Sequence, residues 1–272
     1  MEKFPVSPKY MIHSIWRHRD LIAISSRREI LGRYRGSVMG FMWSFINPIV
    51  MLLIYTFVFS VVFKARWGSG GESNAEFAML LFAGLMVFNI FGECINRAPL
   101  LIVSNVNYVK KVLFPLEILP VVALISAVCH GLISFFVWLV AYFFLFGFPY
   151  LTIFYLPLIL LPLVLLIVGF SWFFASLGVY FKDVNQLISI LTTIVMFLCP
   201  IFYPMTAVPE QYRAILYCNP LTFVVEQIRN VLYFGLHPNF AALMFLGFVT
   251  TVFAWLGFFW FQKTRKGFAD VL

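Results

Sequence analysis

The sequence has few charged residues. Lys, Arg, Asp and Glu make up 11% of its 272 residues, whereas hydrophobic residues make up 62%. Soluble domains contain roughly a quarter charged residues, so this chain cannot cover a soluble globule with polar side chains. It also lacks the phosphate-binding pattern Gly-x-x-x-x-Gly-Lys-Ser/Thr. We therefore expect an integral membrane protein that does not hydrolyse ATP itself.

Cysteine and clustered catalytic residues are also scarce. The four cysteines lie far apart, three of them in apolar segments, at Cys94, Cys129, Cys199 and Cys218. This spacing indicates neither a disulfide framework nor a metal site. Glu117 and Asp183 stand alone in the sequence, which argues against a membrane-embedded glycosyl- or acyltransferase. The spans also lack paired acids, which disfavours an ion-coupled carrier. We predict no catalytic residue, metal ion or cofactor in this chain.

Six uncharged apolar runs separated by polar or Gly/Pro-bearing turns predict six membrane spans. The first apolar run begins behind a charged segment too long and polar for a signal peptide, so we expect the amino terminus to stay on the mature protein. An even number of crossings places both termini on one side of the membrane. The predicted spans are Met39–Phe63, Phe77–Asn96, Pro120–Phe146, Ile153–Phe181, Leu187–Tyr203 and Ala241–Phe261.

The distribution of Lys and Arg predicts the orientation. Fifteen of the nineteen lie on the side that carries the termini, and four lie on the other: Lys64, Arg66, Arg213 and Arg229. Because positive loops stay in the cytoplasm, both termini are predicted to be cytoplasmic. The net charge of +8 then reflects contact with anionic membrane lipids rather than with nucleic acid.

The predicted domains follow from this topology: residues 1–38 as an amphipathic interface segment, 39–261 as the transmembrane domain and 262–272 as a cytoplasmic tail. Met11, Ile12, Ile15, Trp16 and Ile22 share roughly one face of the first segment, which favours a helix along the membrane surface. Gly36 and Gly40 suggest close backbone packing where the chain enters the membrane.

The stretch 204–240 is too apolar for an open loop and too charged for another crossing. Two short helices fit it, Glu210–Tyr217 and Leu221–Phe234. Each contains Glu-x-x-Arg, whose spacing sets opposite charges side by side on a helix. Because charge is costly at the bilayer centre, we expect both helices to be re-entrant and shallow. Their charged residues are Glu210, Arg213, Glu226 and Arg229.

Two ionisable residues within the spans have ordinary explanations. Glu93 lies four residues before Arg97, which favours an ion pair at a helix end over a proton relay. His130, alone on an apolar helix, is interpreted as a hydrogen-bonded packing residue.

Aromatic residues are abundant, with 34 Phe, 12 Tyr and 7 Trp. Lipid contact and core packing account for most of them. Some recur on one face of the first span or gather at the end of the fifth, and stacking on sugar rings would let a polymer slide past. We predict a substrate path at Tyr55, Phe59, Phe63, Phe197, Phe202 and Tyr203.

Several motifs resemble the ABC-2 type permeases that export bacterial surface polysaccharides. They are RYRGS with the following Gly40, Trp43 and Asn47-Pro48, the Asn/Lys-Lys/Phe-Pro pattern of 97–119, NPLTFVVEQIR, and the tail FQKTRKGFADVL. The resemblance covers essentially the full chain. It implies an all-α membrane protein of the ABC-2 (type V exporter) fold, with six spans, an amphipathic interface helix and two re-entrant gate helices.

The resemblance also implies partners and sites. Loop 97–119 would dock on a separate ATPase, which binds ATP and Mg, through Asn105, Asn107, Lys110, Lys111, Phe114 and Pro115. A basic cluster could receive the diphosphate of a lipid-linked glycan, with anchoring to anionic lipid as the simpler alternative. Its residues are Arg28, Arg33, Tyr34, Arg35 and Ser37.

The expected function is the permease subunit of an exporter that moves a lipid-linked polysaccharide, foremost O-antigen, across the bacterial inner membrane as a homodimer with two ATPase subunits. Capsular polysaccharide and teichoic acid are alternative cargoes that no residue separates from O-antigen. A small lipid or drug is a further alternative, over which the abundance of aromatic residues weakly favours a polymer.

Overall fold

The computed structural model describes residues 5–33, 35–62, 74–110 and 114–272, and within them the chain is helical without a strand. The predicted all-helical fold is therefore confirmed. The α-helices are α1 Pro8–Arg17, α2 Arg19–Gly32, α3 Trp43–Tyr55, α4 Asn74–Arg97, α5 Leu100–Val103, α6 Val106–Lys110, α7 Leu119–Phe146, α8 Leu156–Tyr180, α9 Val184–Leu198, α10 Glu210–Tyr217, α11 Pro220–Leu232, α12 Phe240–Thr264 and α13 Phe268–Val271. A π-helix, Thr56–Val62, continues α3. Short 3-10 turns lie at Gly40–Met42, Leu116–Ile118, Leu151–Tyr155, Met205–Ala207 and Arg265–Gly267.

In the described ranges, five helical segments are long and apolar enough to cross a bilayer. They are Gly40–Phe59, Ala75–Arg97, Leu116–Phe146, Leu151–Tyr180 and Phe240–Val271, which correspond to predicted spans one to four and six. The predicted fifth span corresponds to α9, an apolar helix of 15 residues. Its length of about 22 Å is short of a hydrocarbon core of about 30 Å, so the count of six spans stays a prediction. The predicted tail 262–272 is helical from Gln262 to Val271.

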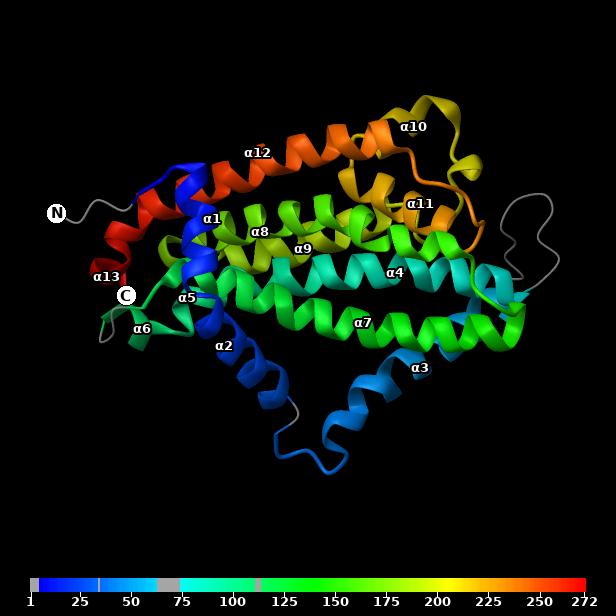
Figure 1. Cartoon of the computed structure of the whole chain (residues 1–272), viewed down its shortest axis with the longest axis horizontal. Helices are drawn as coiled ribbons and strands as arrows, with labels where there is room; N and C mark the ends of the chain where they lie inside the picture. The colour runs from blue at the N-terminus through cyan, green and yellow to red at the C-terminus, as the bar shows by residue number, and fades with distance from the viewer. Residues whose placement is uncertain (1–4, 34, 63–73, 111–113) are drawn as a thin grey trace.

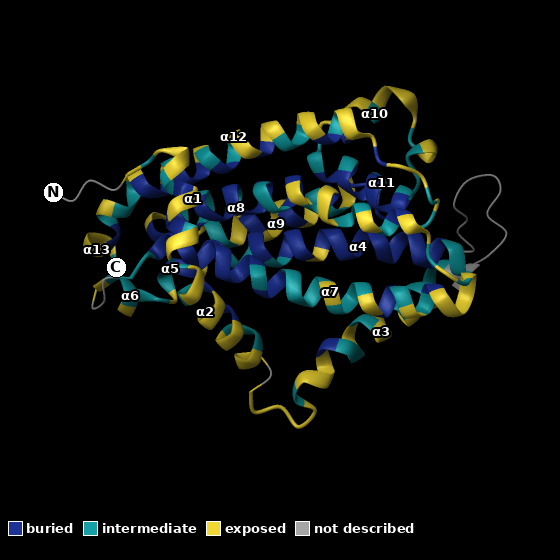
Figure 2. Ribbon diagram, in the orientation of Figure 1, coloured by how far each residue is buried: buried dark blue, intermediate teal, exposed yellow. Residues whose placement is uncertain are grey.

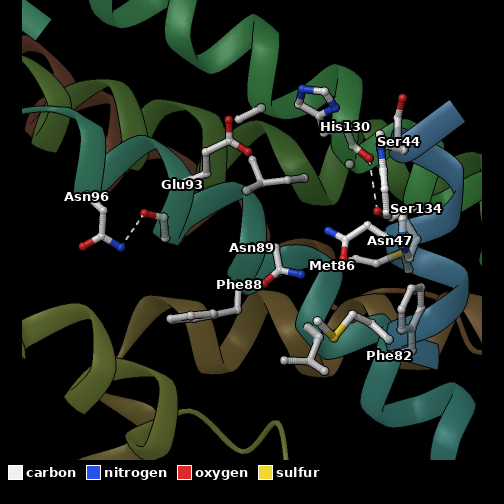
Figure 3. A pocket seen from close by; sticks show the side chains of 18 of the residues that line it. Ser44, Asn47, Phe82, Met86, Phe88, Asn89, Glu93, Asn96, His130 and Ser134 are labelled. Atoms are coloured by element: carbon white, nitrogen blue, oxygen red, sulfur yellow. Dashed lines mark hydrogen bonds between the residues drawn. The ribbon is translucent and has the colours of Figure 1, made fainter. Parts of the chain in front are cut away.

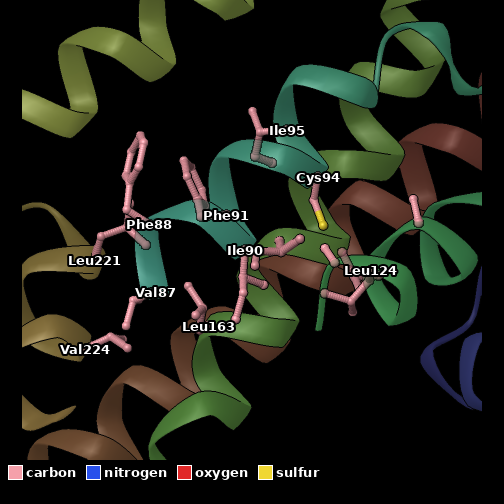
Figure 4. Close-up of a cluster of buried hydrophobic side chains, with 14 of the residues drawn as sticks. Val87, Phe88, Ile90, Phe91, Cys94, Ile95, Leu124, Leu163, Leu221 and Val224 are labelled. Atoms are coloured by element: carbon pink, nitrogen blue, oxygen red, sulfur yellow. The ribbon is translucent and has the colours of Figure 1, made fainter. Parts of the chain in front are cut away.

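Helix α4 forms the centre of the bundle. It packs against α7, α8, α9 and α11, and Figure 2 shows it almost entirely buried. A helix that is apolar on all faces can be packed on all faces without burying charge, and α4 has no charge between Phe77 and Gly92. Figure 4 shows side chains from α4 meeting Leu124 of α7, Leu163 of α8, and Leu221 and Val224 of α11.

Two glycines set the close approach of α8 and α12. A Cβ atom built on Gly257 would lie 2.2 Å from the carbonyl oxygen of Gly169, and one on Gly169 would lie 3.0 Å from the Cα of Ala254. Neither space can hold a methyl group. The two helices therefore contact each other through their backbones at this level.

The first span lies at the edge of the bundle. Only 6% of its apolar window is buried inside the chain, and α2 and α3 diverge from α7 to form a projecting V (Figure 1). Gly36 and Gly40 in the connection have φ values of 86° and 50°, and a Cβ on either would meet nothing within 4 Å. The expected close packing at these glycines is wrong; they serve positive-φ turns instead.

The amino-terminal segment consists of two helices joined at His18. Met11 and Ile22 are buried, while Ile12 and Trp16 are exposed. Helix α2 packs on α7, and α1 contacts α12. Part of the predicted apolar face thus docks on the bundle, and the rest of it, Ile12 and Trp16, stays exposed; its contact with the membrane surface stays a prediction.

Helix α1, which begins the described part of the chain, and the carboxyl terminus lie at the same end of the bundle, together with α5, α6 and α13 (Figure 1). We call this the basic end, and the end with the turns at residues 147–150 and 233–239 the far end. The arrangement agrees with an even number of crossings.

Candidate functional site

Helices α3, α4 and α7 enclose a polar cavity of about 560 Å³ (Figure 3). Asparagine, serine, histidine and charged side chains face it from an otherwise apolar bundle. Its polar lining consists of Arg33, Ser44, Asn47, Asn89, Glu93, Asn96, Arg97, His130 and Ser134. Aromatic side chains complete the wall: Trp43, Tyr55, Phe82 and Phe88.

A balanced network of charges closes the cavity toward the basic end. Arg97 donates to Glu93 (3.3 Å) and to Glu29 of α2 (2.6 Å), and Arg33 pairs with Glu93. The predicted Glu93–Arg97 ion pair is confirmed. Two guanidinium groups face two carboxylates, so the floor of the cavity carries no net charge.

The predicted diphosphate cluster is only partly brought together. Arg33 lines the cavity, but its guanidinium is already paired with Glu93. Arg28 instead donates to the hydroxyl of Tyr108 at 2.8 Å. Arg35 and Ser37 are exposed in the connection to α3, and Tyr34 lies outside the described residues. The site as a diphosphate receptor stays a prediction.

Asn47 and Asn89 were not predicted as site residues. Asn89 is the exposed position in a stretch of α4 where residues 77–88 and 90–92 are buried. Figure 3 shows Asn89 and Asn47 directed into the same space from α4 and α3. Asn96, by contrast, donates to the Gly92 carbonyl (2.9 Å) and accepts from Thr192 (2.9 Å). The signal in the sequence is an uncharged amide inside an apolar span.

Three predicted path aromatics meet in the structure. Phe59 stacks on Phe202 with ring centroids 6.0 Å apart, and Phe202 lies 5.8 Å from Phe197. Phe77, which was not predicted, stacks on Phe59 at 5.6 Å. Tyr55 lines the polar cavity, and the Tyr203 hydroxyl donates to the Phe197 carbonyl (2.9 Å). Phe63 lies outside the described residues. The first span and the end of α9 therefore share one aromatic cluster.

The predicted coupling loop folds into α5, α6 and a 3-10 turn at Leu116–Ile118. Tyr108 stacks on Phe114 with centroids 4.3 Å apart. Asn105 donates to the Leu101 carbonyl (2.9 Å), while Asn107 and Lys110 are exposed. Pro115 is half-buried, and Lys111 falls outside the described residues. The described residues of loop 97–119 thus form a structured surface at the basic end.

Glu117 does not stand alone in the fold. It is buried and pairs with Arg265 near the carboxyl terminus at 2.5 Å, and it accepts a hydrogen bond from Ser14 of α1 at 2.9 Å. Its carbonyl accepts from the Trp172 indole (2.9 Å), and Arg265 also donates to the Phe114 carbonyl (3.0 Å). Sequence distances of 103 and 148 residues hid these partners from sequence reasoning. We call this group the Glu117 clasp.

The two short helices predicted between spans five and six are present as α10 and α11. Arg213 lies 3.8 Å from Glu210, as expected. Arg229 and Glu226 influence each other electrostatically, as the spacing predicted, but the hydrogen bonds of Arg229 go to other parts of the chain. Arg229 is buried and donates to the carbonyls of Leu80 (2.9 Å), Pro200 (2.6 Å) and Ile201 (2.8 Å).

Arg229 keeps its charge although it is buried. Burial lowers the pKa of its guanidinium to about 10, which is still well above neutral pH. The three carbonyls compensate that charge with their negative ends, and two of them follow directly after α9. Helix α11 is consequently packed into the bundle, whereas α10 is largely exposed at the far end.

Comparison with known families decides the assignment. Residues 20–233 match the family model described as ABC-2 type transporter. The chain belongs to this family. ABC-2 transporters are membrane proteins with several spans, in agreement with the helices described above.

Relatives of this ABC-2 transporter are similar over most of their length. It is 25% identical over 262 residues to the O-antigen export system permease protein RfbA of Myxococcus xanthus, covering 96% of this chain and 98% of the relative. A protein of the same name from Klebsiella pneumoniae is 25% identical over 257 residues, covering 93% of this chain and 95% of the relative. The polysialic acid transport protein KpsM of Escherichia coli is 26% identical over 238 residues, covering 85% of this chain and 88% of the relative.

Proposed function

We propose that this ABC-2 transporter is the permease subunit of an exporter of lipid-linked polysaccharide, with O-antigen as its foremost cargo. The observation that carries the proposal is the likeness to O-antigen export permeases over 96% of the chain. The aromatic cluster of Phe59, Phe197 and Phe202 supports it, because aromatic rings stack on the apolar faces of sugars without requiring one linkage.

We further propose that the basic end faces the cytoplasm of the bacterial inner membrane. The excess of Lys and Arg at this end supports that orientation. Loop 97–119, with exposed Asn107 and Lys110, would receive the ATPase subunit. ATP and Mg belong to that partner, because this chain has no phosphate-binding loop.

A homodimer with two ATPase subunits is proposed from the exposure of the first span. Its window is only 6% buried within one chain, and α9 also presents exposed apolar residues such as Leu187, Ile194 and Phe197. Two copies facing each other through these helices would form a path that one packed bundle lacks. ATP-driven movement of loop 97–119 would then be transmitted to this interface.

Copurification tests the proposal. An untagged nucleotide-binding subunit should copurify with the tagged chain at a ratio of one to one, and ATP hydrolysis should require both proteins. Lys110→Glu should weaken the association, whereas Lys9→Glu, at an exposed site on α1, should leave it unchanged. Transport activity by the purified chain alone would overturn the proposal.

The cargo has its own test. Expression of the chain in a strain lacking its O-antigen permease should restore surface O-antigen. The similarity to a polysialic acid transport protein makes capsular polysaccharide the second candidate. Restoration of capsule export but not of O-antigen export would favour it.

A further inference from the structure

The carboxamides of Asn47 and Asn89 are presented to the polar cavity without partners inside the described part of the chain. Both residues are exposed, although each lies within a predicted membrane span. Their side chains sit at similar depths, about 10 Å from Gly40 along α3 and about 12 Å from Arg97 along α4. An amide exposed to hydrocarbon at such a depth is costly, so these groups require water or a ligand.

Pro48 adds a hydrogen-bond acceptor beside them. It lies inside α3 and has no N–H to donate to the carbonyl of Ser44, one turn earlier. Ser44 itself lines the cavity. The wall therefore offers donors and acceptors together: two carboxamides, the Ser134 hydroxyl and a backbone carbonyl.

Charge argues against an anionic ligand in this cavity. Arg33 and Arg97 are paired with Glu93 and Glu29, so a phosphate would meet no unbalanced positive charge. A zwitterionic lipid headgroup would have to break these ion pairs to be recognised. An uncharged ligand rich in hydroxyl groups needs no unbalanced positive charge and leaves these ion pairs intact.

The aromatic wall completes the pattern. Trp43, Tyr55, Phe82 and Phe88 line the same cavity, whose volume of about 560 Å³ lies within the range of small-ligand sites. Carboxamides can hydrogen-bond to the hydroxyl groups at the edge of a pyranose ring, and aromatic side chains can stack on its apolar face. The two together suit a sugar.

We propose that the cavity between α3, α4 and α7 binds one or two sugar residues of the glycan within a single protomer, with Asn47 and Asn89 hydrogen-bonding to ring hydroxyls. The inference rests on the proposed function and names a sugar site inside each subunit, apart from the aromatic cluster at Phe59. The charged floor, with its Arg97–Glu29 contact to α2, then links occupancy of the cavity to the amino-terminal segment.

Saturation-transfer NMR on the full-length chain in discs of phosphatidylethanolamine and phosphatidylglycerol tests the proposal. The probes are the methyl glycosides of glucose, galactose, mannose and N-acetylglucosamine, with glycerophosphoethanolamine as the headgroup probe. At least one glycoside should receive saturation on its ring protons. The double variant Asn47→Leu/Asn89→Leu should lose about tenfold in affinity, because several hydrogen bonds disappear.

The choice of variants distinguishes a loss of binding from a failure to fold. Leucine has the same number and branching of side-chain heavy atoms as asparagine and is more favourable in a membrane span, so the double variant should insert and fold. Thr251→Val is the matched control, since Thr251 is an exposed polar residue of α12 outside the cavity. It should bind the glycoside as the unmodified chain does.

Three results would overturn the proposal: no glycoside binds, binding survives in the double variant, or only glycerophosphoethanolamine binds at Asn47 and Asn89. Failure of the proposed function is a separate result, seen as a chain that binds glycosides at this cavity but recruits no ATPase.

Discussion

Arg265 and Arg229 place permanent positive charges inside the bundle, and each is compensated differently. Arg265 meets the buried carboxylate of Glu117, with 14% and 3% of the two side chains exposed. Arg229 meets three backbone carbonyls. A carboxylate removes the net charge from the site, whereas carbonyls only solvate it. Removing either partner leaves polar groups buried without compensation.

The Glu117–Arg265 pair should show strong coupling in a double-mutant cycle. Glu117→Gln and Arg265→Gln should each destabilise the protein by about 3–5 kcal/mol, because the remaining charge is stranded. The double variant should lose less than the sum of the two. Unfolding in detergent micelles, followed by circular dichroism, measures these free energies. Asp183→Asn, at an exposed position, is the control, and additive effects would contradict the expected coupling.

Arg229→Leu should be more destabilising than Arg213→Leu. The first variant leaves the buried carbonyls of Pro200 and Ile201 without their donor, at about 1–3 kcal/mol each. Arg213 also donates to carbonyls, at Val208 and Thr206, but water can replace it because its side chain is 35% exposed. The stability of Arg229→Lys should lie between that of Arg229→Leu and that of the unmodified protein. Lysine keeps the charge, but its ammonium group lacks the planar set of donors of a guanidinium. Equal midpoints for both leucine variants in thermal unfolding would refute this account.

At the scale of the helices, close backbone contact holds α8 and α12 together. Both helices are apolar on every side, so hydrophobicity alone does not specify which faces meet. Gly169 and Gly257 specify it by allowing a separation that any side chain would prevent. Such small-residue contacts are common in membrane helix pairs, where packing rather than water exclusion drives association.

Gly257→Ala should destabilise the protein by about 1–3 kcal/mol, because its methyl group would overlap the Gly169 carbonyl. Gly247→Ala is a matched control on the same helix. A Cβ there would find its nearest neighbour at 4.0 Å, the Cγ of Pro162, so this change should be neutral or slightly stabilising. Thermal unfolding of the two variants in one detergent distinguishes them. A similar loss in both would show that the close contact is unimportant.

Hydrophobic runs and turn residues were sufficient to predict most helices. The end of α10 followed from Asn219-Pro220, whose local geometry dictates where a helix stops. Local spacing also predicted the Glu93–Arg97 pair. By contrast, Arg229 was assigned to Glu226 because their spacing is local, whereas its partners Leu80 and Pro200 lie 149 and 29 residues away. No pattern within one helix carries that information.

The candidate site was likewise predicted only in part. Phe59 was predicted from the recurrence of aromatics on one face of the first span, and Phe197 and Phe202 from their place at the end of the fifth; the three do meet. Asn47 was read as part of an Asn-Pro bend and Asn89 was passed over, because one amide in an apolar helix has no meaning until its neighbours are known. Their common cavity depends on how α3 and α4 pack.

The two ends of the whole molecule differ in the segments that they carry. Helix α1, the carboxyl terminus and loop 97–119 gather at the basic end, while the turn between α10 and α11 lies at the far end (Figure 1). Cys218 is exposed in that turn, whereas Cys94 and Cys199 are buried. A single native thiol thus reports on the far end.

An impermeant maleimide applied to intact spheroplasts should label Cys218 in a Cys129→Ser background. Labelling should disappear in Cys218→Ser. When Lys266→Cys is added to the protein that carries both Cys129→Ser and Cys218→Ser, the new thiol should react only after the membrane is permeabilised, because Lys266 lies at the basic end. Mass spectrometry of the purified chain measures both. Reaction of the Lys266→Cys variant from outside would reverse the proposed orientation.

The Glu117 clasp has a consequence for biosynthesis. Arg265 is added to the growing chain 148 residues after Glu117, when nearly every other helix has already been made. Until then the carboxylate of Glu117 has, among the described residues, the Ser14 hydroxyl as its partner. Native packing at this point must wait until residue 265 has left the ribosome, so a nascent chain stopped before residue 265 cannot form the contact that joins α1, Glu117 and Arg265.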